Sequence, residues 1–131
     1  MGQNPARSVV EDIISLITQE EWAHLKFKSS LRYDRDTKQR NQALEMVVLK
    51  TICAFMNAEG GTLLIGLSDD NQVMGIDEDY TTLKSHNRDG FQNLLMSMVS
   101  NSIGNYYLQY VDVVSKTFSG RPCARSTSQP R

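Results

Sequence analysis

Apolar side chains recur along this chain with two different periods, and the change of period separates predicted helices from predicted strands. Between residues 41 and 57 they fall three and four positions apart, as on the buried face of an amphipathic helix. The same spacing predicts a first helix over residues 8–18 and another over residues 88–103. Gly60 follows the central helix and suits the left-handed conformation that ends helices.

The first predicted strand covers residues 24–28 and shows a strict alternation of side chains. Leu25 and Phe27 alternate with Lys26 and Lys28. Successive side chains of a strand point to opposite faces, so the two apolar residues are expected inward and both lysines on one exposed face.

Three further segments have the composition of strands. Residues 62–67 form a near-continuous apolar run, typical of a central strand that is covered on both faces. Residues 72–76 are predicted to form a hairpin with it, and residues 106–114 are rich in aromatic and β-branched side chains. The order of elements predicts an α+β fold, in which a mixed β-sheet packs against two main α-helices.

A chain of 131 residues has room for one domain, which we place at residues 1–114 with a core over about 8–114. Residues 115–131 are expected to be the remnant of a final hairpin followed by a disordered tail, because residues 126–131 are polar throughout.

Charge along the chain is uneven, although the formal net charge is only −1. This balance excludes a generally basic nucleic-acid-binding surface. Any nucleic-acid contact therefore has to be predicted from local clusters of charge. Between residues 26 and 40 six cationic side chains face only two acids, which predicts contacts to a phosphate backbone without sequence specificity. The alternative is a solvated charged loop. The candidate nucleic-acid-binding residues are Lys26, Lys28, Arg32, Arg35, Lys38 and Arg40.

Cys53 and Cys123 are far apart and form no CxxC pair, which argues against a disulfide framework or a zinc site. The N-terminal residues lack the pattern of a secretory signal, and no apolar run is long enough to span a bilayer. We therefore expect a cytoplasmic protein without membrane association. The sequence does not distinguish a monomer from a homodimer.

Residues 54–70, with the sequence AFMNAEGGTLLIGLSDD, are followed at a short interval by Gly75 and Ile76. Together with residues 25–30, LKFKSS, they resemble the Schlafen AlbA-like (AlbA_2-type) domain of bacterial proteins, over roughly residues 14–113. The resemblance implies a DNA-binding or regulatory module, such as part of a bacterial transcriptional regulator. Because family members usually continue beyond the corresponding point, it also implies that this chain is a fragment of a longer bacterial protein. DNA is the expected partner ahead of RNA, and no cofactor is expected.

Relatives of the Schlafen type that cut RNA carry two glutamates and an aspartate as an acidic site. The resemblance places Glu21 and Asp69 at two of these positions, whereas Lys26 stands where the second glutamate is found. A lysine there repels each unit of positive charge on a metal ion by about 4 kcal/mol at a separation near 4 Å and an effective dielectric constant of 20. A nuclease using Glu21 and Asp69 with Mg or Mn is the alternative function, and the sequence favours a module without enzymatic activity.

A protein-interaction domain, acting through an exposed edge strand at residues 106–114, is the third alternative. Gly60 and Gly61 do not suggest a phosphate-binding loop, because they follow a helix and precede a strand, the reverse of the order in such loops.

Overall fold

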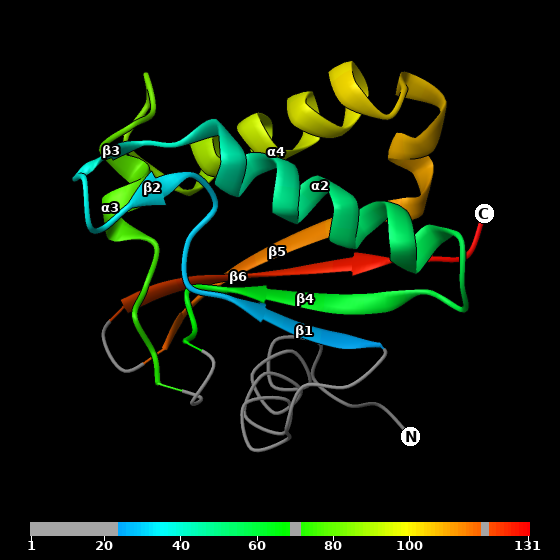
Figure 1. Cartoon of the computed structure of the whole chain (residues 1–131), viewed down its shortest axis with the longest axis horizontal. Coiled ribbons are helices and arrows are strands. Elements are labelled where there is room, and N and C mark those ends of the chain that lie inside the picture. The colour runs from blue at the N-terminus through cyan, green and yellow to red at the C-terminus, as the bar shows by residue number, and fades with distance from the viewer. Residues whose placement is uncertain (1–23, 69–71, 119–120) are drawn as a thin grey trace, which may run out of the picture.

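A four-stranded sheet in the order β1-β4-β6-β5 forms the centre of the structure (Figure 1). The computed structural model describes residues 24–68, 72–118 and 121–131. The pair β1–β4 is parallel and the pairs β4–β6 and β5–β6 are antiparallel, so the sheet is mixed. The strands are β1 (Leu25–Lys28), β4 (Gly61–Ile65), β5 (Val111–Phe118) and β6 (Arg121–Ser128).

Two long helices, α2 (Gln42–Met56) and α4 (Arg88–Ser102), cover the same face of this sheet (Figure 1). The fold is α+β, as predicted. The main core lies between sheet and helices and includes Ile52, Phe55, Leu63, Ile65 and Leu95, each no more than 3% exposed. Burying such side chains is the main favourable term for a domain of this size.

Both long helices begin at asparagines that cap their free amides. The side chain of Asn41 accepts a hydrogen bond from the amide of Ala43, and Asn87 accepts one from Gly90. Asparagine is among the most favourable residues at this position. The predictions of helices at residues 41–57 and 88–103 are confirmed to within a residue or two. The helix predicted at residues 8–18 lies outside the described residues.

The alternation predicted for β1 is confirmed, but its two lysines are half-buried and do not lie on an exposed face as predicted. Leu25 and Phe27 are each 1% exposed and form a small second cluster with Leu64 and Leu67. Lys26 and Lys28 are paired in register with Leu63 and Ile65, which belong to the main core, and therefore share the face that α2 covers. β4 lies inside the sheet, and its apolar residues are buried on both faces, as expected for a central strand.

The strand predicted over residues 106–114 is wrong in its first half. Asn105–Tyr110 form a 3-10 helix, η1, and β5 begins only at Val111. Gly104, at φ +137°, turns the chain after α4, and its carbonyl oxygen accepts a hydrogen bond from the amide of Tyr107. The tyrosines that suggested a strand pack against one another instead, because β-propensity reflects packing on a pleated surface more than the backbone itself.

The polar C-terminal segment is ordered, and the prediction of a disordered tail at residues 126–131 is wrong. β6 runs to Ser128 between β4 and β5, and the boundary placed at residue 114 falls inside β5. Ser126 and Ser128 are 0% and 3% exposed, because small side chains fit against the core at these positions. Beyond β6, the amides of Gln129 and Arg131 donate to the carbonyl oxygens of Tyr110 and Met56.

Residues 72–76 form less of a hairpin than predicted. A single antiparallel bridge joins Leu67 and Val73, and the amides of Met74 and Gly75 both donate to the carbonyl oxygen of Gly66. A short helix, α3 (Asp77–Tyr80), follows. The segment predicted as a loop over residues 29–40 contains a small two-stranded hairpin, β2 (Tyr33–Asp34) with β3 (Gln39–Arg40).

The carboxylate of Asp79 holds the turn after β1. Three consecutive amides, of Leu31, Arg32 and Tyr33, each donate to it at 2.9 Å. Asp79 is only 1% exposed, and burial raises the pKa of its carboxyl above the usual value, although the three donors act in the opposite direction. We call this arrangement the Asp79 clamp, and it ties α3 to a segment more than 40 residues earlier in the chain.

We expect Asp79→Asn to lower the free energy of unfolding by roughly 2 kcal/mol, because an amide accepts through one oxygen and leaves at least one buried amide unpaired. Urea denaturation measures the change. Asp112→Asn, at an exposed position of β5, is the matched control and should stay within about 0.5 kcal/mol of the parent. Equal stability of the two variants would contradict the clamp.

Candidate functional site

The arginines of the predicted basic loop are engaged in ion pairs. Arg32 is 8% exposed, and its Nε and Nη2 donate to Thr82 Oγ1 at 2.9 Å and to the Thr82 carbonyl oxygen at 2.6 Å. Its Nη1 lies 3.4 Å from Glu45 Oε1. The guanidinium is therefore a structural link between the turn after β1, α2 and the segment after α3, and it is not presented to solvent.

Arg35 and Arg40 also have acidic partners. Arg35 Nε lies 2.9 Å from Glu78 Oε1, and Arg40 Nε lies 3.0 Å from Glu45 Oε1. Lys38 is exposed in the β2–β3 connection, at φ +58°. The structure thus does not bring the six predicted phosphate ligands together, because three of them neutralise acids of the fold.

Lys26 and Lys28 line a groove between β1 and α2, where Lys50 joins them from the helix. The groove has a volume of about 540 Å³. None of the three lysines forms an ion pair with any residue that the structure describes. We call this feature the lysine groove; its lining is Lys26, Lys28, Val47, Lys50, Thr51, Ala54, Phe55 and Ala58.

Lys50 was not among the predicted site residues. In the sequence it is only the single cationic residue of the helix predicted at 41–57, and no local sequence pattern indicates that it lies opposite β1. The remainder of the groove is mainly apolar, and its Val47 is 42% exposed. A surface with cations along an apolar wall suits a ligand that has both anionic and apolar parts.

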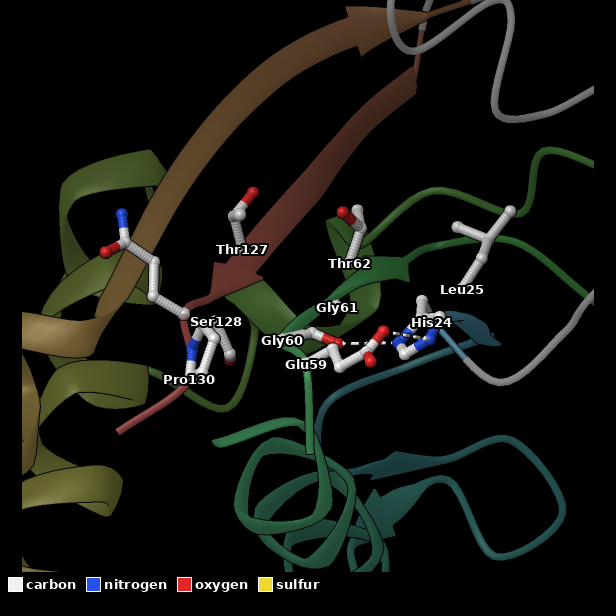
Figure 2. A pocket seen from close by; sticks show the side chains of 10 residues that line it. His24, Leu25, Glu59, Gly60, Gly61, Thr62, Thr127, Ser128 and Pro130 are labelled. Atoms are coloured by element: carbon white, nitrogen blue, oxygen red, sulfur yellow. Dashed lines mark hydrogen bonds and ion pairs between the residues drawn. The ribbon is translucent and has the colours of Figure 1, made fainter. Parts of the chain in front are cut away.

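A second hollow, of about 400 Å³, surrounds the turn between α2 and β4 (Figure 2). His24 Nδ1 donates to the Gly60 carbonyl oxygen at 2.9 Å, and Nε2 lies 3.7 Å from a Glu59 carboxylate oxygen. Gly60 adopts φ +89°, and a Cβ on Gly61 would clash with the ring of Phe55. These glycines are required by the turn and its packing, which agrees with the sequence argument against a phosphate-binding loop.

The two acidic residues of the nuclease alternative, Glu21 and Asp69, lie outside the described residues. Lys26, which occupies the third position of that pattern, is in the lysine groove. Within residues 24–68, 72–118 and 121–131, no three His, Cys, Asp or Glu side chains converge as metal ligands would. In the same ranges no helix combines the length and the apolar composition that crossing a bilayer requires.

Comparison with known proteins identifies a family and solved structures with a similar fold. The family model described as "Schlafen, AlbA_2" matches residues 21–118. The crystal structure of the DIP2311 protein from Corynebacterium diphtheriae has a TM-score of 0.60 to this chain at 14% identity, so the likeness concerns the fold alone. The match covers 98% of this chain and 27% of DIP2311, and this chain therefore spans about a quarter of that protein.

We expect Arg32→Met to lower the free energy of unfolding by roughly 2–3 kcal/mol, because it leaves the Thr82 carbonyl oxygen and part of Glu45 without their donor. Urea denaturation is again the measurement. Lys38→Gln, in the same segment but exposed, is the control and should change stability by less than about 0.5 kcal/mol. A loss of stability as large in Lys38→Gln as in Arg32→Met would refute the structural role of Arg32.

Proposed function

The chain belongs to the Schlafen AlbA_2 family, and we propose that it is a nucleic-acid-binding module that contacts the phosphate backbone through the lysine groove. The observation that carries the proposal is the convergence of Lys26, Lys28 and Lys50, from two elements, without acidic partners among the described residues. Cations with no partner of their own are the ones that an incoming phosphate can neutralise.

The spacing of the lysines supports contacts to successive phosphates. Lys26 and Lys28 are two positions apart on a strand, so that their Cα atoms are separated by about 6.6 Å. This is close to the separation of neighbouring phosphates in an extended nucleic-acid strand. Lys50 lies across the groove on α2 and contacts the same backbone from its other side.

The groove has the composition of a surface that does not read base sequence. Its lining contains no Asn or Gln, which bind adenine edges in a bidentate manner, and no Arg, whose planar guanidinium pairs with guanine at fixed angles. Recognition therefore rests on charge and on the apolar wall. The expectation of DNA ahead of RNA comes from the family and not from the groove. In a longer bacterial protein such a module serves a regulatory role by bringing its neighbouring domains to nucleic acid.

Replacing Lys26, Lys28 and Lys50 together by Gln is expected to weaken binding to DNA at low salt by at least ten-fold. Each lost phosphate contact reduces the slope of log affinity against log salt by about 0.7 for a single strand and 0.9 for a duplex. Titrations of labelled single-stranded DNA, duplex DNA and structured RNA across a salt series measure both quantities. Lys84→Gln, an exposed lysine between α3 and α4, is the matched control.

Affinity and salt slope that are the same in the triple variant and in Lys84→Gln would contradict the proposal. The same samples, incubated with magnesium or manganese and run on a denaturing gel, test the nuclease alternative. Metal-dependent cleavage that is lost in Glu21→Gln and Asp69→Asn would show that the protein is a nuclease and not only a binding module.

A further inference from the structure

A third hollow, of about 270 Å³, lies on another side of the last turn of α2. Its lining includes Met56 and Asn57 from the end of α2, Ser102 and Ile103 from the end of α4, Tyr107 from η1, and Arg131. We call it the tyrosine hollow. Neither the family nor the nucleic-acid contacts proposed above assign it a role.

The tyrosine hollow has the chemistry of a site for a planar heterocycle. Met56 and Ile103 supply apolar surface, Tyr107 supplies an aromatic face, and the Asn57 amide can pair with a polar edge. Arg131 extends over the Tyr107 ring, with its guanidinium carbon 5.9 Å from the ring centroid and Nη1 3.3 Å from the phenol oxygen. Aromatic and guanidinium groups together are the usual platform on which single-stranded bases stack.

The tyrosine hollow adjoins the lysine groove around the end of α2. Asn57 lines the former and the next residue, Ala58, lines the latter. Ala54 and Ala58, which line the groove near the end of α2, are exposed and small, so that they leave room for a strand along this part of the helix surface. A helix is about 10 Å across, a distance that a strand covers within about two nucleotides. Figure 1 shows the end of α2 and η1 at the same end of the molecule.

We propose that the tyrosine hollow receives one unpaired base of a single-stranded nucleic acid whose phosphates occupy the lysine groove. The inference rests on the proposed function and deepens it by naming the class of substrate. Tyr106 is 66% exposed, with its ring 5.2 Å from that of Tyr107 in an edge-on arrangement, and it offers an adjoining surface to the next base. A base held in a duplex cannot enter the hollow, and the module therefore prefers single strands.

The experiment compares oligothymidylate with a strand of equal length in which every nucleotide is abasic. The parent chain is expected to bind oligothymidylate about ten-fold more tightly, since stacking of a base on an aromatic side chain contributes that much. Ser102→Phe, at an exposed position at the end of α4, fills the hollow and lowers this preference without changing affinity for the abasic strand. Ser97→Phe, also exposed on α4 but outside the hollow, is the matched control and retains the preference.

Equal binding of the two strands by the parent chain, or an undiminished preference in Ser102→Phe, would overturn the inference while leaving the proposed function standing. The triple lysine variant separates the two claims, because it weakens binding to both strands if the lysine groove holds phosphates. Binding to both strands that is unaffected by the lysine replacements, or no binding to either strand by the parent chain, would overturn the proposed function and this inference with it.

Discussion

The Asp79 clamp is the constraint on which the lysine groove depends. One buried carboxylate binds three consecutive amides and so fixes the direction of the chain as it leaves β1. The same turn places Arg32 against Glu45 of α2 and against Thr82 after α3. The strand and the helix that form the two walls of the groove are thus connected by a network of charged and backbone groups, and a buried network whose members are paired makes the structure rigid.

The arginines of the β2–β3 region form ion pairs within the fold, whereas the lysines of the groove do not. The chemistry of the two side chains explains this difference. Arg32, Arg35 and Arg40 form the ion pairs of the β2–β3 region, where a planar guanidinium can bond to two or three partners at fixed angles. Lys26, Lys28 and Lys50 remain without acidic partners among the described residues. An ammonium group is strongly hydrated and mobile, which suits transient contacts to phosphates along a backbone.

Much of the fold could be predicted from the sequence, and most of the candidate site could not. The alternation in β1, the apolar run of β4 and the spacing in α2 and α4 are local patterns that tertiary packing respects. The patterns failed at η1, where three tyrosines pack on one another, and at β6, where small polar residues occupy an interior strand. The local charge pattern could not show that Arg32 and Arg40 pair with Glu45, just beyond the loop, or that Arg35 pairs with Glu78, 43 residues further along the chain. Lys50 likewise joins Lys26 only in the folded chain.

The most direct test of the lysine groove is an NMR titration of the isotope-labelled chain with a short single-stranded DNA. We predict that amide shifts change at Lys26 and Lys28 and along residues 47–58, while the β2–β3 hairpin at residues 33–40 changes little. Shifts concentrated at residues 33–40 instead, with the groove unaffected, would contradict the account. They would indicate that the basic loop predicted from the charge pattern is the nucleic-acid interface.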